Sequence, residues 1–132
     1  MRELQRVLCI EDEQNIRTLI KLGLEKVGGL TVQACSSGEE ALREALAFAP
    51  DVILLDVMMP GMDGPSTLKA LRQMPALEGV PVIFMTAKVQ PHEIAQYKLL
   101  GACDVIAKPF SPMTLAEQVK AIWNRCNDLP TG

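Results

Sequence analysis

The most constraining feature of the sequence is a run of four apolar residues, 52–55, that ends in a carboxylate, Asp56. Such a run without alternating polar residues is typical of a strand buried on both faces, as in the middle of a parallel sheet. Pro60, Gly61 and Gly64 follow closely and predict that the chain leaves the sheet at or just after Asp56. Because a charge inside a sheet is costly to desolvate, we expect Asp56 to face the crevice at the carboxyl end of the strand, where open α/β sheets bind ligands.

Three further apolar runs end at polar residues in the same way. The runs and the residues that follow them are 7–10 with Glu11 and Asp12, 82–85 with Thr86, and 104–107 with Lys108 and Pro109. The carboxyl ends of parallel strands meet at one edge of a sheet. We therefore expect three acids, a hydroxyl and an ammonium to share one rim.

Size and composition exclude several classes of protein. The length of 132 residues suggests one domain, over 1–126, with a tail at 127–132. Apolar residues make up 48% of the chain, enough for a full core, and 22% charged residues argue against disorder. The net charge of −3 provides no basic footprint for nucleic acid and no polybasic patch for a membrane. No apolar run reaches membrane-spanning length and the first residues lack a signal-peptide pattern, so we expect a cytoplasmic protein.

The cysteines and the histidine offer little for chemistry. Cys9, Cys35, Cys103 and Cys126 are widely scattered, without the spacing of a metal site or a redox motif. We expect structural thiols rather than a disulfide. His92 is the only histidine, which leaves little to build a zinc site or a histidine-based triad.

Apolar periodicity and capping residues predict five strands that alternate with five helices. Asp12 is expected to cap the first helix, Ser37 the second and Ser111 the last. Short right-handed connections make this an α/β fold, a doubly wound parallel sheet of flavodoxin-like order 2-1-3-4-5. The expected strands are 6–10, 30–34, 52–56, 80–85 and 103–107, and the expected helices are 13–27, 38–47, 65–73, 93–100 and 112–126.

In that strand order the first and third strands are neighbours, so Glu11, Asp12 and Asp56 converge in one acidic pocket. Ionised carboxylates this close require a counter-charge. A hard divalent cation such as Mg²⁺ supplies it and prefers oxygen ligands. Lys108 adds a positive charge and Thr86 a hydroxyl donor. This chemistry suits phosphoryl transfer, with Asp56 as the nucleophile that forms an aspartyl-phosphate.

These motifs together resemble a bacterial response-regulator receiver domain of two-component signal transduction, over about residues 6–125. The motifs that carry the resemblance are Glu11-Asp12, Asp56 with the loop 59–64, Thr86-Ala87, and Lys108-Pro109-Phe110. The resemblance implies that Asp56 accepts a phosphoryl group from a phosphohistidine of a sensor histidine kinase or a histidine phosphotransfer protein. The phosphorylated domain then changes its affinity for a partner, either a downstream target protein or an output domain that follows it.

The resemblance also implies how the metal is held. Asp12, Asp56 and the backbone carbonyl of Met58 would bind Mg²⁺, or Mn²⁺ in its place, directly. Glu11 would act through a water molecule.

The same resemblance assigns the groups on the other side of the pocket. Thr86 and Lys108 would hold the phosphoryl oxygens, Ala87 would follow Thr86 in the switch loop, and Lys108-Pro109 would be a cis peptide bond.

Two features of this chain depart from the family pattern. Many receivers carry a mobile aromatic residue three positions before the lysine, but this position is Val105 here, which puts the usual readout in doubt. Met58 and Lys88 occupy the positions that tune phosphoryl lifetime, and neither side chain can act as a base toward water. We therefore expect slow hydrolysis of the aspartyl-phosphate and no turnover of an independent substrate.

Two other classes of function compete with this interpretation. A phosphohydrolase of the haloacid dehalogenase type would resemble Asp-x-Asp at this strand end, but the second position is Met58. A nucleotide- or flavin-binding fold would need a glycine-rich phosphate loop, and none occurs. Turnover of a generic phosphomonoester, or a bound flavin or nucleotide, would favour one of them. A stand-alone regulator and a domain cut from a longer protein both remain open.

Overall fold

The computed structural model describes residues 3–127 and contains one five-stranded parallel sheet of order β2-β1-β3-β4-β5. This is the predicted topology, and the strand bounds agree with prediction to within two residues. The strands are β1 Arg6–Ile10, β2 Thr31–Cys35, β3 Val52–Asp56, β4 Val82–Thr86 and β5 Asp104–Ala107.

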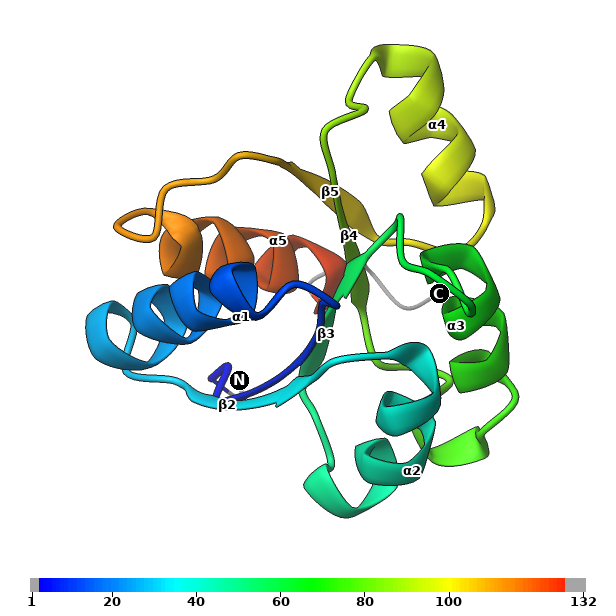
Figure 1. Ribbon diagram of the computed structural model, residues 1–132, viewed down its shortest axis with the longest axis horizontal. Coiled ribbons are helices and arrows are strands. Elements are labelled where there is room, and N and C mark those ends of the chain that lie inside the picture. Colours follow the sequence, from blue (N-terminus) through cyan, green and yellow to red (C-terminus); the bar gives the residue numbers. More distant parts are fainter. Residues whose placement is uncertain (1–2, 128–132) are drawn as a thin grey trace.

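Helices cover both faces of the sheet (Figure 1). α1 and α5 lie on one face, and α2, α3 and α4 pack on the other. The helices are α1 Gln14–Lys21, which continues as the π-helix η1 Leu22–Val27, α2 Gly38–Phe48, α3 Gly64–Arg72, α4 Pro91–Leu99 and α5 Leu115–Asn127, with a short 3₁₀ turn η2 at Pro75–Leu77.

β3 lies in the centre of the sheet, and each of its five residues is buried. This confirms the prediction made from its continuous apolar run. Alternate residues point to opposite faces. Leu54 belongs to the core under α1 and α5, whereas Ile53 and Leu55 belong to the core under α2 and α3. The strand that ends in Asp56 is therefore held from both sides.

Local caps start the helices that border the rim. The Ser37 side chain accepts a hydrogen bond from the Glu40 amide at 3.1 Å and begins α2, as predicted. Asp63 accepts one from the Ser66 amide at 2.9 Å and begins α3, with Pro65 in the first turn. These caps fix the chain close to where it leaves β2 and β3.

The structure corrects three local predictions. Glu13 rather than Asp12 is the N-cap of α1, and its side chain makes no capping hydrogen bond, because Asp12 belongs to the acidic cluster. The last helix begins at Leu115 rather than 112, because the Thr114 and Leu115 amides both bond to the Ser111 carbonyl and close a turn first. Leu46 lies on the apolar side of the predicted helix 38–47, which predicts that it is buried, but it is 54% exposed.

The prediction of four free thiols is half wrong. Cys9 and Cys35 are free and buried, but Cys103 and Cys126 form a disulfide. Their Cα atoms lie 6.5 Å apart although 23 residues separate them in sequence. The pairing depends on how α5 returns along β5, which cysteine spacing alone does not show.

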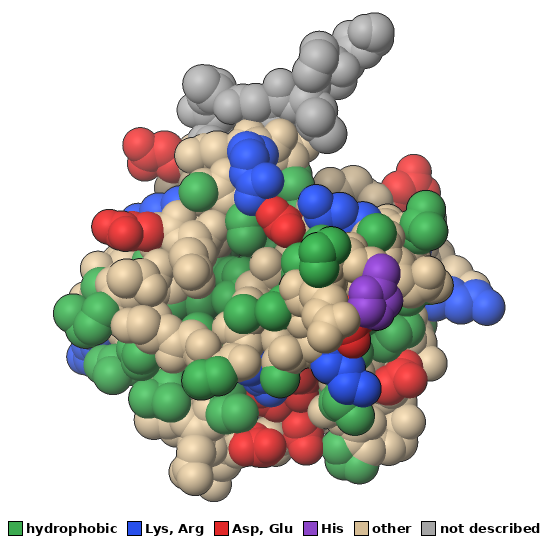
Figure 2. Space-filling view, turned by 90° about the horizontal axis from the view of Figure 1, so that it is seen from above, with side chains coloured by type: hydrophobic (Ala, Val, Ile, Leu, Met, Phe, Trp, Pro, Cys, Tyr) green, Lys and Arg blue, Asp and Glu red, His purple; other side chains and the backbone are tan. Residues whose placement is uncertain are grey.

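α4 is the most weakly buried helix described, and it has no buried residue. Its main anchor is Tyr97, whose ring contacts that of Phe84 edge-on at a centroid distance of 5.5 Å. Leu99 is 82% exposed. The face of the molecule seen from above Figure 1 carries hydrophobic side chains among charges of both signs rather than one basic field (Figure 2).

The predicted tail falls outside the described residues from position 128 on, and Asn127 still belongs to α5. Within residues 3–127, no helix has the length and apolar character needed to cross a membrane.

We expect Gly64→Ala to lower the free energy of unfolding by about 1–3 kcal/mol. A Cβ atom at Gly64 would lie 2.7 Å from the Asp56 carbonyl oxygen and 2.7 Å from the Val57 Cα, both of them backbone atoms. This overlap outweighs the gain of about 0.4–1 kcal/mol that alanine brings through the unfolded chain. Urea unfolding measures the difference.

Gly79→Ala is the matched control. A Cβ atom there meets nothing within 4 Å, so the free energy of unfolding should change by less than about 0.5 kcal/mol. Equal effects at the two positions would show that the backbone approach at Gly64 is not the constraint.

Candidate functional site

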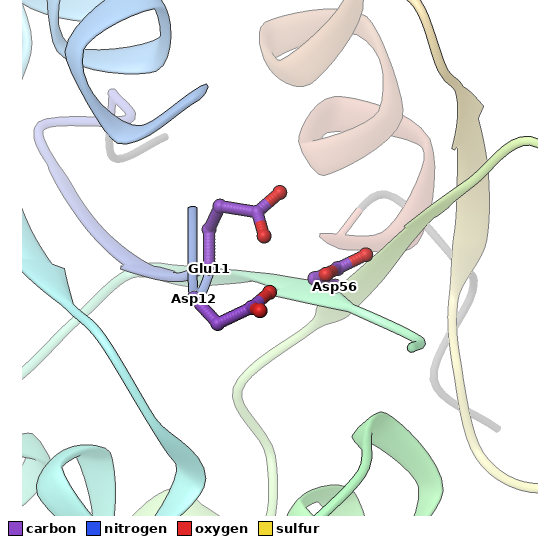
Figure 3. A group of neighbouring side chains, drawn as sticks. All are labelled: Glu11, Asp12 and Asp56. Atoms are coloured by element: carbon purple, nitrogen blue, oxygen red, sulfur yellow. The ribbon is translucent and has the colours of Figure 1, made fainter. Parts of the chain in front are cut away.

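The strand order brings the acids together at the carboxyl edge of the sheet. Glu11 and Asp12 follow β1, and Asp56 is the last residue of β3, the neighbouring strand. One carboxylate oxygen from each lies within 4.8 Å of the others, and Figure 3 shows the side chains turned toward a common space. Glu11 is fully buried and Asp56 is 3% exposed. The expected convergence is present in the structure.

Lys108 reaches this cluster from the loop after β5. Its ammonium Nζ lies 2.7 Å from Glu11 Oε1 and donates a hydrogen bond to Asp56 Oδ1 at 3.0 Å. Since β4 lies between β3 and β5, the lysine side chain reaches across the end of β4 to contact Asp56. The predicted amine therefore joins the predicted acids.

Burial and crowding shape the charges of this pair. Burial is the main cause that raises the pKa of Glu11, and the Asp56 carboxylate adds to it, while the Lys108 ammonium works in the opposite direction; the net pKa is about 7. For Lys108, burial works to lower the pKa, but the contacts with Glu11 and Asp56 and their charges outweigh it and raise the pKa. The ammonium of Lys108 thus stays protonated, but its one positive charge does not balance the negative charge of the acidic cluster.

The cluster fits a divalent cation. When all three carboxylates are ionised, the single ammonium leaves a surplus of two negative charges. Glu11 Oε1 is buried and makes no hydrogen bond with the described residues, although it pairs with the lysine charge. Carboxylate oxygens are the ligands that Mg²⁺ and Mn²⁺ prefer. Met58 lies two residues beyond Asp56 with its side chain 66% exposed, and the role of its carbonyl stays a prediction.

Thr86 ends β4 at the same rim and is 3% exposed. Its hydroxyl accepts a hydrogen bond from the Lys88 amide at 3.1 Å, so its own proton is available to a ligand. Ala87 and Lys88 follow as exposed residues. The Thr86 carbonyl accepts from the Lys108 amide at 2.9 Å and links the two loops.

Two positions that the resemblance singles out lie in β5 and in the loop that follows it. The Lys108-Pro109 bond is cis, as expected. Val105 pairs with Phe84 in the sheet, and both pack in the core under α2 and α3. The aromatic ring next to Phe84 comes from Tyr97 of α4 and not from position 105.

Arg17 is a site-positioning residue that the sequence analysis missed. Its guanidinium donates hydrogen bonds to the backbone carbonyls of Glu11 at 2.8 Å and Asp12 at 2.9 Å. It therefore fixes the loop that carries both acids. A lone arginine in the first turns of an amphipathic helix gives no sequence signal for this contact.

Comparison with known proteins agrees with this geometry. The family model described as "Response regulator receiver domain" matches residues 7–120. The alkaline phosphatase synthesis transcriptional regulatory protein PhoP of Bacillus subtilis is 40% identical over 121 residues, which cover 92% of this chain and 49% of that protein. The DNA-binding response regulator MtrA of Mycobacterium tuberculosis is 33% identical over 126 residues, covering 96% of this chain and 54% of the relative. The chain thus spans about half the length of these relatives.

Solved structures lead to the same family. The chemotaxis response regulator CheY4 of Vibrio cholerae superposes with a TM-score of 0.83 at 31% identity, covering 90% of this chain and 98% of that one. The receiver domain of the Francisella response regulator 1452 gives a TM-score of 0.80 at 32% identity, covering 92% and 98%. Because the family model matches most of the sequence and the fold agrees throughout, this chain belongs to the response regulator receiver domain family.

Proposed function

We propose that the chain is a phospho-acceptor signalling domain in which Asp56 takes a phosphoryl group from a phosphohistidine of a sensor histidine kinase or a histidine phosphotransfer protein. The observation that carries this proposal is the Asp56 carboxylate at the end of β3, held at 3.0 Å by Lys108 beside two further acids. A buried carboxylate fixed in this way is oriented for attack at the open rim.

In the transfer step a carboxylate oxygen of Asp56 attacks phosphorus. A P–O bond forms as the P–N bond to the histidine breaks, and the leaving imidazole retains the electron pair of that bond and can take up a proton. The Lys108 ammonium pairs with one phosphoryl oxygen and the Thr86 hydroxyl donates to another. Glu11, Asp12, Asp56 and the Met58 carbonyl would hold Mg²⁺ or Mn²⁺, which supplies positive charge against the phosphoryl oxygens when bound.

The signal leaves the site through the α4 side of the domain. A phosphoryl group adds about 1.5–2 negative charges, which draw the Thr86 hydroxyl and shift its loop. α4 follows that loop and has no buried residue, so a small shift can re-position it. Val105 cannot swing as an aromatic side chain does. The output is therefore a change in backbone and in α4, read by a target protein or an output domain in the cytoplasm.

The first test uses a small phosphodonor, acetyl phosphate, with Mg²⁺ and intact-mass measurement. Wild type should gain one phosphoryl group, and Asp56→Asn should gain none because it lacks the nucleophile. Asp63→Asn is the matched control, since it makes the same change in the same loop and asparagine still caps α3. Labelling that survives Asp56→Asn would overturn the proposal.

The second test concerns the metal. A ligand that binds only the folded state at about ten times its Kd adds about 1.4 kcal/mol of stability. For a domain of this size we expect MgCl₂ to raise Tm by about 4–7 °C in wild type, and by much less in Asp12→Asn.

The control for the metal test is Glu39→Gln, which removes one exposed acid from the surface of α2. It should keep the wild-type response, because its charge lies outside the cluster. Equal Tm shifts in wild type, Asp12→Asn and Glu39→Gln would point to general screening rather than a site.

The third test measures how long Asp56-phosphate lasts in purified protein with Mg²⁺. We expect slow decay, because the thioether of Met58 and the ammonium of Lys88 cannot activate water. Met58→Asp supplies a carboxylate base beside the site and should speed hydrolysis at least about tenfold, whereas Met58→Leu should not. A wild-type half-life of only seconds would contradict the prediction.

A further inference from the structure

The disulfide between Cys103 and Cys126 joins the residue just before β5 to the last turn of α5. Cys103 is held in the sheet by its amide, which donates to the Val82 carbonyl at 2.8 Å. Cys126 lies near the described end of α5. The bond therefore fastens a helix end to a strand that the sheet already fixes.

Within residues 3–127, few other contacts fasten this turn. Trp123 anchors the preceding turn, since it is 4% exposed and its Nε1 donates to the Asp51 carbonyl at 3.1 Å. Beyond Trp123, the Arg125 guanidinium pairs with Asp104 at 2.6 Å, but the Arg125 side chain is 63% exposed. Exposed ion pairs contribute little to stability. Among the described residues, the covalent bond is thus the strongest tie of the last turn.

The four cysteines differ sharply in reactivity. Cys9 and Cys35 are both 0% exposed, and burial raises the pKa of both thiols, that of Cys35 to about 12. Buried neutral thiols neither attack nor exchange. Cys103 and Cys126 are partly exposed, so external thiols can reach their bond. The chain thus carries one accessible thiol pair and two protected thiols.

We propose that Cys103 and Cys126 form a redox modification site that exchanges with a protein dithiol and controls the mobility of the last turn of α5. A thiolate of the dithiol attacks one sulfur, and the other cysteine leaves as a thiolate and takes up a proton. The second thiol of the dithiol then resolves the mixed disulfide. The net result is two electrons and two protons delivered to the pair, while the dithiol becomes a disulfide.

The regulatory reading rests on the cytoplasmic location given in the proposed function. In reducing compartments disulfides are rare and are usually transient. The bond would then form by the reverse exchange, in which the disulfide form of the protein dithiol takes up the two electrons and two protons, and it would be lost when that dithiol is reduced. It borders a groove of about 310 Å³ between β5 and α5, whose lining includes Asp104, Val105 and Arg125. Its redox state would therefore alter the β5–α5 surface without touching the acceptor pocket.

The first experiment equilibrates the purified chain in glutathione buffers, alkylates it and maps the peptides. Cys103 and Cys126 should be protected under oxidising conditions and alkylated under reducing conditions. Cys9 and Cys35 should react only after denaturation. Free alkylation of the pair in the oxidised buffer would overturn the proposal.

The second experiment compares hydrogen exchange of oxidised and reduced wild type. Amides of residues 124–127 should exchange roughly tenfold faster after reduction, while peptides around Asp56 stay unchanged. Cys126→Ser should behave like the reduced form in either buffer, and Cys35→Ala should keep the redox response. Identical exchange in oxidised and reduced wild type would refute control of the helix end.

Acetyl phosphate labelling separates this proposal from the previous one. Cys126→Ser should accept the phosphoryl group on Asp56 as wild type does, because the disulfide lies outside the acceptor pocket. Loss of labelling in this variant alone would contradict the proposed independence of the two sites. Failure of labelling in wild type would overturn the proposed function and leave the thiol chemistry untouched.

Discussion

The ammonium of Lys108 between Glu11 and Asp56 is the contact on which the site depends. It lies 2.7 Å from one carboxylate and 3.0 Å from the other, and both acids are buried. Removing one partner from such a group leaves uncompensated charge in a poorly solvated space, which typically costs several kcal/mol. A single ammonium cannot balance three carboxylates, however. The remaining negative charge makes the pocket a place for added positive charge, which a phosphoryl-transfer site requires.

The strand order alone brings about this excess of carboxylates over ammonium groups. Placing β1 beside β3 puts three acids on adjacent strand ends, and placing β5 beyond β4 makes the lysine approach from the far side. The acids and the lysine therefore meet at the rim where Thr86, the last residue of β4, offers its hydroxyl. The loop after β3 has to turn back tightly to leave this space, and the backbone contact at Gly64 shows how little room it has. Apolar packing on both faces of β3 holds the strand in place. It thereby keeps the carboxylates close together although their charges repel one another.

The sheet and the site could be predicted because each depends on local signals that repeat. Apolar runs ending in polar residues mark the strand ends, and the connection rules then fix the order of the strands. Features that depend on distant segments left no such signal. The π-helical end of α1 accompanies the close approach of Gly23 to the backbone of Pro112, and the disulfide requires α5 to return to the start of β5. Arg17 was missed for the same reason, since it binds backbone carbonyls that carry no sequence pattern.

Val105 and α4 together suggest how a domain of this kind can signal without the usual aromatic residue. In the sheet Val105 faces the same core as Phe84, and the ring that contacts Phe84 belongs to Tyr97 on α4. The aromatic contact beside the Thr86 strand is therefore carried by the helix that has to move, rather than by the strand. A shift of the Thr86 loop would then act on α4 from both its N-terminal end and its main anchor, Tyr97. Because α4 has no buried residue, the energy that opposes such a shift is small, and the charge that phosphorylation would add at Asp56 would be large enough to overcome it.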